Sequence, residues 1–416
     1  MKGVPRLLVL STSLPGTRHG GGVVQEAILR RYPKDRYVCF AVRPPDGWPA
    51  CGELPEPLRG VPCLFGPLVP WVNLRGARFY MPLLRALGFR LVARHRVRQA
   101  VAFGRRHRAE MVWGELQGDA LVLAQAVAEG LGVPLAGTVW DDPAGWLADG
   151  GCDRLSRRLL LRRFREALKA ARSLSTAGEA MQRAYHRDYG VRSVILRHGF
   201  DAPARHQKSG NDGAITVGFV GSLYGRDAWS AFLSAAARLN ASHRLRPIRL
   251  RVFGAAAFPY GCNGVQVDFR GWQPAEEMLR EIALTDFCYL PYWFDPAKRR
   301  HVELSFPNKF ETYLAAGRPV LFHGPSYAGI AEAVKQYGVG MCVHSLNEEE
   351  MTAALERLIR DKRLRESFGL AALAAFHAQF NATVMMEQFA ELIGVDPGLL
   401  QQQRSATVPC AADTHE

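Results

Sequence analysis

Lys309 stands at the start of a short predicted helix, where a cation is out of place. Pro307 suits the first helical position because its missing N–H needs no partner there, and Gly317 and Pro319 end the segment. The amino end of a helix carries partial positive charge and prefers an anion. Lys309 and the backbone N–H groups of this turn therefore predict a site for phosphate or pyrophosphate. The alternative is a solvated lysine on an exposed turn.

A second candidate follows the apolar run Ile215–Val220. Gly221 and Gly225 let the backbone approach a ligand closely, and Arg226 suits bidentate contact with phosphate. Any turn between a strand and a helix can carry glycines, so this motif alone is weak. Because both candidate loops follow predicted strands, we expect them on the carboxyl edge of one parallel sheet, where α/β proteins bind ligands.

The elements that position these residues alternate between short apolar runs and amphipathic helices. The first run, 6–11, precedes a loop with glycines 20–22, and a proline-rich irregular stretch covers about 43–70. A polar segment at 201–213 interrupts the alternation, which restarts and ends with one long helix at 363–392. This pattern predicts an α/β protein of two tandem, doubly wound, Rossmann-like domains. The expected parts are a first domain at 1–203, a hinge at 204–213, a second domain at 214–375, a helix returning to the first domain at 376–394 and a disordered tail at 395–416.

The composition is that of a globular protein without a membrane span. Of 416 residues, 48% are hydrophobic and 22% are charged, and no apolar run reaches the roughly 18 residues that a spanning helix needs. Eight cysteines are scattered without metal-binding spacing, which predicts reduced thiols in the cytoplasm. The net charge of +14 is uneven, because residues 1–209 carry +16 and the remainder carries −2. This asymmetry predicts different partners for the two halves.

The stretch Glu303-Leu-Ser-Phe-Pro-Asn-Lys-Phe-Glu311, with Ala-Ala-Gly317-Arg-Pro319 further on, resembles the donor-binding domain of GT-B glycosyltransferases. It is most similar to the retaining family GT4, in the form found in polysaccharide and O-antigen assembly. Arg197-His-Gly-Phe-Asp201 is similar to the family's exit from its first domain. The resemblance implies a nucleotide-sugar donor held by the second domain and an acceptor held by the first.

The resemblance also implies roles for residues of this stretch. Glu311 is expected to bind the ribose hydroxyls, and Glu303 the hydroxyls of the donor sugar. Ser305 and Asn308 belong to the same donor-binding group, and Lys309 lies between Asn308 and Glu311.

Further donor-binding residues lie in other loops. Lys309 and Arg226 are expected to neutralise the departing diphosphate, where negative charge develops in the transition state. Gly221 lies in the same group, and Gly21 and Gly22 resemble the family's glycine-rich loop near the donor phosphates. No Asp-x-Asp occurs in the chain, so we expect no metal and no cofactor beside the nucleotide-sugar substrate.

Two carboxylates are the catalytic candidates of the first domain. Asp141 and Asp142 follow the predicted strand at 134–140, so their side chains should reach the cleft between the domains. One of them could orient the acceptor hydroxyl or stabilise positive charge at the sugar. Alternatively, Asp142 caps the turn that follows.

Two predicted helices, at 90–108 and 154–172, combine arginines with apolar residues. This pattern is typical of a helix that lies on anionic lipid, and the alternative is a core stripe with a solvated face. Nucleic acid is not expected, because no nucleic-acid motif accompanies the charge.

The resemblance, together with these features, implies transfer of a sugar from a UDP- or GDP-sugar to a saccharide or lipid-linked acceptor in cell-surface polysaccharide synthesis. Retention of configuration is implied by the resemblance alone. The expected location is cytoplasmic and peripheral on the membrane. The alternatives are a sugar-nucleotide epimerase of the same fold and a non-catalytic binding protein.

Overall fold

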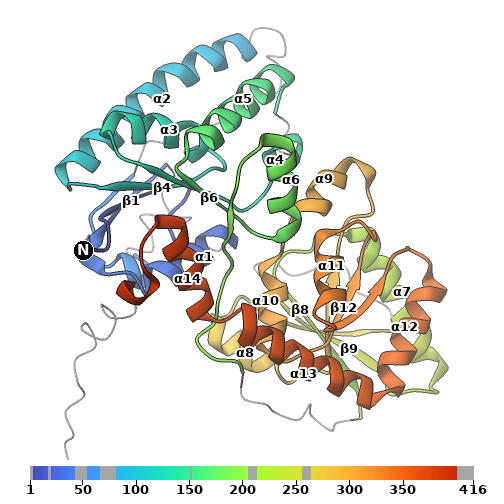
Figure 1. Cartoon of the computed structure of the whole chain (residues 1–416). Helices are drawn as coiled ribbons and strands as arrows, with labels where there is room; N and C mark the ends of the chain where they lie inside the picture. The colour runs from blue at the N-terminus through green and yellow to red at the C-terminus, as the bar shows by residue number, and fades with distance from the viewer. Residues whose placement is uncertain are drawn as a thin grey trace, which may run out of the picture. The chain divides into compact units, whose positions relative to one another are not determined.

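The chain divides into two compact units, one formed by Met1–Arg197 with Met385–Glu416 and the other by His198–Val384 (Figure 1). The computed structural model describes residues 3–16, 20–42, 54–65, 81–149, 152–204, 213–254 and 264–400, without the side chains of 81–90 and 148–149. Most of the expected hinge and the tail from 401 onwards lie outside the described residues.

A seven-stranded parallel sheet forms the centre of the first unit. Its strand order is β3-β2-β1-β4-β5-β6-β7. The strands are β1 (Leu7–Ser11), β2 (Tyr37–Ala41), β3 (Cys63–Phe65), β4 (Met111–Glu115), β5 (Leu135–Val139), β6 (Ser173–Thr176) and β7 (Val194–Ile195). Every residue of β1, β2 and β5 is buried, as expected for strands that helices cover on both faces.

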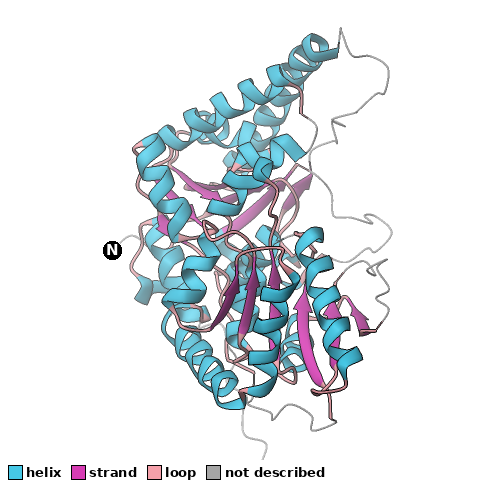
Figure 2. Cartoon of the chain, turned by 90° about the vertical axis from the view of Figure 1, so that its right-hand side faces the viewer, coloured by secondary structure: helices cyan, strands magenta, loops and turns pink. Residues whose placement is uncertain are grey.

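The helices of the first unit connect these parallel strands. They are α1 (Gly20–Leu29), α2 (Met81–Arg106), α3 (Ala120–Leu131), α4 (Pro143–Asp149), α5 (Arg154–Ala170) and α6 (Glu179–Tyr189). Most of α14 (Ala382–Ile393) also belongs here, since Phe389 packs against Trp113 and Tyr32 with ring centroids 4.7 and 5.8 Å apart. Figure 2 shows helices along both sides of the strands.

The second unit contains a six-stranded parallel sheet of order β10-β9-β8-β11-β12-β13. Its strands are β8 (Ile215–Val220), β9 (Ile248–Phe253), β10 (Gln266–Gly271), β11 (Phe287–Pro291), β12 (Val320–His323) and β13 (Gly340–Val343). Its helices are α7 (Arg226–Ser242), α8 (Ala275–Ile282), α9 (Arg299–Leu304), α10 (Asn308–Ala315), α11 (Gly329–Gln336), α12 (Glu348–Arg360) and α13 (Lys362–Gln379). The prediction of two doubly wound α/β units is confirmed.

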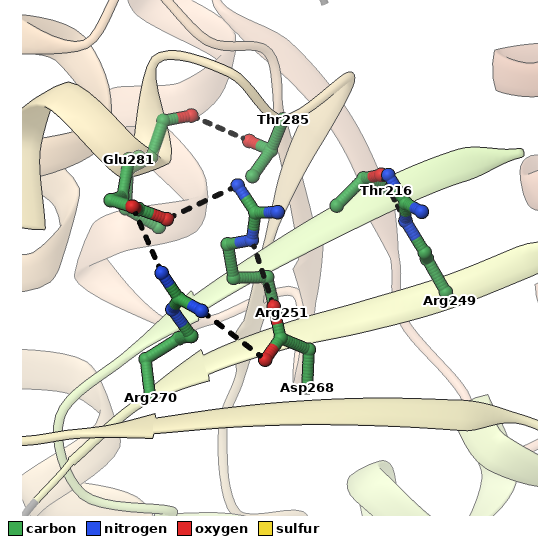
Figure 3. Close-up of polar contacts among 8 residues, drawn as sticks. Thr216, Arg249, Arg251, Asp268, Arg270, Glu281 and Thr285 are labelled. Carbon is green, nitrogen blue, oxygen red and sulfur yellow. Dashed lines mark hydrogen bonds and ion pairs between the residues drawn. The ribbon is translucent and has the colours of Figure 1, made fainter. Parts of the chain in front are cut away.

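Ion pairs connect β9 and β10, at one edge of this sheet, with α8 (Figure 3). Arg251 on β9 lies 3.3 Å from both Asp268 on β10 and Glu281 on α8, and Arg270 lies 3.1 Å from Glu281. Arg270 is the extra residue of a bulge between Phe269 and Gly271. Charges and a bulge at an edge strand discourage pairing with another chain, so this network secures and shields the sheet edge.

The single long helix expected at 363–392 is wrong, because the structure has two helices, α13 and α14. Asn381 separates them, and its side chain accepts hydrogen bonds from the N–H groups of Thr383 and Val384 at the start of α14. Its backbone meets the segment that leads into the second unit, where a Cβ on Gly199 would lie 2.4 Å from the Asn381 carbonyl oxygen. The break therefore depends on a tertiary contact as well as on a cap.

Two further expectations were wrong, and one helix was not expected. Glycines 20–22 form the first turn of α1 rather than a loop, because Gly21 packs directly on Trp140 and a Cβ there would lie 2.4 Å from the indole ring. The stretch expected to be irregular contains the edge strand β3. Helix α9 precedes the predicted helix α10 and carries Glu303, which the sequence placed in one stretch with Glu311.

Candidate active site

Lys309 is buried at the start of α10, with 6% of its surface exposed. Its Nζ donates a 2.6 Å hydrogen bond to the carbonyl oxygen of Ser222 in the loop after β8. The same atom lies 4.6 Å from the ring centre of Phe219 and 4.2 Å from that of Tyr224, which are cation–π distances. The predicted lysine is thus held against the glycine loop by a carbonyl group and two aromatic faces.

Burial lowers the pKa of Lys309 from 10.5 to about 7. Within the described part of the chain, no carboxylate lies within ion-pair distance of this lysine. A buried ammonium group without a counter-charge is unfavourable in a ligand-free protein, and an anion would relieve that cost. The environment of Lys309 therefore favours binding of an anion, and the alternative of a solvated lysine is wrong.

The loop after β8 is shaped by two glycines. Gly221 has φ +80°, a conformation that favours glycine, and it lies close to the Lys309 side chain. A Cβ on Gly225 would lie 2.1 Å from the carbonyl oxygen of Tyr292, so the loops after β8 and β11 meet there. Arg226 is exposed at the first position of α7. The structure thus brings Gly221 and Lys309 together and places Arg226 where this loop ends and α7 begins.

Three other predicted donor-binding residues surround the start of α10. Glu311 is in its first turn and only 1% exposed. Ser305 is buried, and its hydroxyl lies 3.0 Å from the phenol oxygen of Tyr292. Asn308 is partly exposed at the first position of the helix, and Pro307 lies one position earlier than expected, at the N-cap.

Glu303 has a different environment from the rest of this group. It lies on α9, and its carboxylate forms a 2.8 Å ion pair with Arg299 one turn earlier. The Arg299 guanidinium also stacks over Tyr327, 4.3 Å from the ring centre. The structure shows Glu303 in a partly exposed surface pair, whereas Ser305, Lys309 and Glu311 are buried at or next to the start of α10.

The predicted residues of the first unit lie at the carboxyl edge of its sheet. Gly21 and Gly22 are in the first turn of α1, and Gly21 contacts Trp140 just after β5. Asp142 is buried, accepting a 3.0 Å hydrogen bond from the N–H of Ala144 and one of 3.2 Å from the Tyr185 hydroxyl. This is the geometry of the capping alternative. Asp141, by contrast, is partly exposed.

Glu115, which the sequence reasoning missed, ends β4 at the same edge. It accepts a 2.9 Å hydrogen bond from the N–H of Thr12. Burial raises its pKa to about 7, and the nearby charge of Asp141 adds to the effect. A glutamate at the end of an apolar strand is the only sequence signal of this group, and it does not distinguish a functional carboxylate from a solvated one.

Trp272 was also missed. It is 55% exposed and follows β10 on the carboxyl side of the second sheet. Neighbouring strands lie about 4.8 Å apart, so two strand spacings separate it from the end of β8 by roughly 10 Å. A large exposed aromatic side chain at the carboxyl edge of a parallel sheet is a candidate for stacking on a ring of a ligand. The Gly271–Trp272 pair after a strand was the available signal.

A cavity of about 270 Å³ lies elsewhere, along β8, β9 and β10. Its lining includes Thr216, Arg249 and Asp268, which belong to the polar network of Figure 3 or adjoin it. These residues precede the carboxyl ends of their strands, so the Lys309 loop remains the candidate site. Among the described residues, no three His, Cys, Asp or Glu side chains are grouped to hold a metal ion.

Comparisons with known proteins bear on the second unit and on the fold. The sequence model of the family described as glycosyl transferases group 1 matches residues 214–361. A comparison with curated protein sequences gave no match. The chain is similar to the structure of HepE from Anabaena in complex with UDP, at 16% identity and a TM-score of 0.65, covering 94% of this chain and 99% of that one.

Two other solved structures are also similar. One is the α,α-trehalose 6-phosphate synthase of Burkholderia multivorans, at 14% identity and TM-score 0.60, with 99% of this chain and 100% of that chain covered. The other is WaaG, a glycosyltransferase involved in lipopolysaccharide biosynthesis, at 15% identity and TM-score 0.59, with 93% and 99% covered. At these identities the likeness shows the fold.

The fold and the matched segment together define a glycosyltransferase of the GT-B class. Residues 214–361, which hold Lys309, Glu311 and the glycine loop, form its group 1 glycosyltransferase domain. The predicted enzyme class is confirmed.

Proposed function

We propose that the protein transfers a sugar from a UDP- or GDP-sugar to a saccharide or lipid-linked acceptor, with retention, in the assembly of a cell-surface polysaccharide. The proposal depends above all on Lys309, whose buried side chain at the start of α10 lies against the glycine loop. The diphosphate of the donor supplies the anion that the described residues around Lys309 do not provide. HepE is described in complex with UDP and with UDP-glucose, which favours a uridine donor.

In this proposal Lys309 and Arg226 stabilise the charge that develops on the leaving diphosphate. Glu311 binds the ribose, Trp272 stacks on the base, and the backbone of Gly221 approaches the phosphates. The carboxyl edge of the first unit, with Glu115 and Asp141, binds the acceptor. No metal takes part, because the fixed cations supply the positive charge.

Isothermal titration with UDP, GDP and pyrophosphate tests the donor site, and incubation with UDP-sugars and lipid-linked acceptors tests transfer. Binding of a nucleotide diphosphate and formation of an α-linked product from an α-linked donor are expected. An inverted product would refute retention, and isomerised donor without an acceptor would identify an epimerase. If the protein binds no nucleotide, the proposed donor site at Lys309 is refuted.

We also propose that the first unit contacts anionic membranes through α2 and α5. Five exposed cations follow one ridge of α5 at spacings of three and four residues: Arg154, Arg158, Arg162, Arg165 and Lys169. Both α2 and α5 pack on α3 (Figure 1), and each carries an exposed leucine, Leu91 at 67% and Leu155 at 41%. Exposed cations with apolar residues beside them suit an anionic lipid surface. No helix in the described part of the chain is long and apolar enough to cross a membrane.

Cosedimentation with phosphatidylcholine vesicles, with and without phosphatidylglycerol, tests this contact. The triple variant R158Q/R162Q/R165Q should lose affinity for the anionic vesicles, at about 1 kcal/mol for each cation. A matched variant, R244Q/R360Q/R363Q, removes three exposed arginines from the second unit and should bind as the wild type. Equal losses in both variants would show that only net charge matters.

A further inference from the structure

Cys39 and Cys63 lie opposite each other on neighbouring strands of the first unit. In the parallel ladder of β2 and β3 the register pairs Cys39 with Cys63, and the N–H of Cys39 donates a 3.0 Å hydrogen bond to the carbonyl oxygen of Pro62. Paired residues of a ladder carry their side chains on the same face. The two thiols therefore face each other although 23 residues separate them in the sequence.

The backbone spacing suits a covalent link between the two residues. Neighbouring strands lie about 4.8 Å apart, and the Cα atoms of a disulfide lie roughly 4.4–6.8 Å apart. Cys63 is the first residue of a three-residue edge strand, so small shifts of β3 can bring the sulfur atoms to bonding distance. Both cysteines are reduced in this structure.

The two thiols have different environments. Cys39 is buried, at 1% exposure, and burial raises its pKa. Cys63 is partly exposed, and a hydrogen bond from the Cys39 thiol lowers its pKa. Burial raises the pKa of Cys288 to about 12 and that of Cys342 to about 11. Cys63 is therefore set up as the reactive thiolate, with Cys39 beside it as a protonated partner.

We propose that Cys39 and Cys63 form an oxidisable dithiol, a reversible modification site that a hydroperoxide converts to a disulfide. The Cys63 thiolate attacks one oxygen of the peroxide, forming a sulfenic acid and releasing hydroxide. The Cys39 thiol then displaces water from that sulfenic acid and forms the S–S bond. In total, two thiols are oxidised and hydrogen peroxide is reduced to two waters. A dithiol reductant reverses the reaction and frees the edge strand again.

Peptide mapping of the full-length protein tests this pair. The reduced protein is treated with equimolar hydrogen peroxide, blocked with N-ethylmaleimide and digested with trypsin. We expect the peptide that contains Cys63 to be linked to peptide 37–59, and dithiothreitol to release it. Peptide 37–59 also carries Cys51, so the link is assigned with Cys51→Ala, which should keep it.

Two variants then separate the roles of the thiols. Cys39→Ala should lose the link and accumulate a sulfenic acid at Cys63 that dimedone traps, whereas Cys63→Ala should lose both products. A link that persists in Cys39→Ala, or a wild-type Cys63 that stays fully alkylated after peroxide, would overturn the proposal. If replacing the buried Cys39 prevents folding, peptide mapping of the wild type and of Cys51→Ala still shows whether Cys39 and Cys63 become linked. Far-UV circular dichroism and thermal unfolding of each variant serve as a separate readout of folding.

Discussion

Replacing Lys309 by methionine should make the ligand-free protein more stable and its nucleotide binding much weaker. Methionine keeps the length of the side chain and its contacts with Phe219 and Tyr224, but it removes the buried charge. Burial lowers the pKa of Lys309 from 10.5 to about 7. At 1.36 kcal/mol per pKa unit, this disfavours the native state by about 5 kcal/mol well below pH 7, and by about 4 kcal/mol at pH 7, where half of the native molecules have already lost the proton. The methionine variant also loses the 2.6 Å hydrogen bond to Ser222, which offsets roughly 1 kcal/mol of the stability gained by removing the charge.

The pH dependence of the unfolding free energy tests whether the buried charge of Lys309 is what destabilises the ligand-free protein. Between pH 7 and about 10.4 the unfolded chain binds a proton at Lys309 that the native protein has lost, so wild-type stability rises with pH in this window. The Lys309→Met protein lacks this pH-dependent contribution to stability. The difference in unfolding free energy between the two should be largest below pH 7 and should vanish towards pH 10.4. Urea denaturation at several pH values measures it.

Nucleotide binding should change in the opposite direction. A diphosphate raises the pKa of Lys309, so wild-type affinity for UDP should fall above pH 7 by up to about 10-fold per pH unit. Lys309→Met should bind UDP more weakly by about 2–5 kcal/mol. The affinity of this variant for UDP should not show the decrease above pH 7. Lys335→Met, at an exposed lysine of α11, is the matched control and should change neither property much. A Lys309→Met protein that is less stable at pH 7, or that binds UDP as the wild type does, would refute the reasoning.

Three further substitutions test separate parts of the site. Trp272→Ala should weaken UDP binding by about 1–3 kcal/mol and leave pyrophosphate binding unchanged in calorimetry; an equal loss for both ligands would argue against base stacking. Gly225→Ala puts a Cβ 2.1 Å from the carbonyl oxygen of Tyr292 and should destabilise the protein by about 1–3 kcal/mol in urea denaturation, while Gly3→Ala, with no atom within 4 Å, should be neutral. Asp142→Ala removes the cap of α4 and should lower stability by about 1 kcal/mol without changing UDP affinity; a selective loss of transfer at full stability would instead assign Asp142 to catalysis.

Lys309 could be chosen as a candidate from the sequence because its signal is local. A proline, a lysine and a glycine within about ten residues define a helix start, a misplaced cation and a helix end. The fold class was predictable for a similar reason, since buried parallel strands read as short apolar runs and their helices as amphipathic segments. Both conclusions follow from the order of neighbouring residues.

Tertiary contacts decided the features that the sequence could not show. Gly21 is a glycine because Trp140, more than one hundred residues later, occupies the space of its side chain. Glu303 and Glu311 stand eight residues apart, yet α9 places one in a surface pair with Arg299 while α10 buries the other. A pKa, a clash or a partner depends on which distant atoms fill the space around a residue. The sequence determined which side chains could bind a diphosphate, and only the packing of the second unit decided that Lys309 is the buried one.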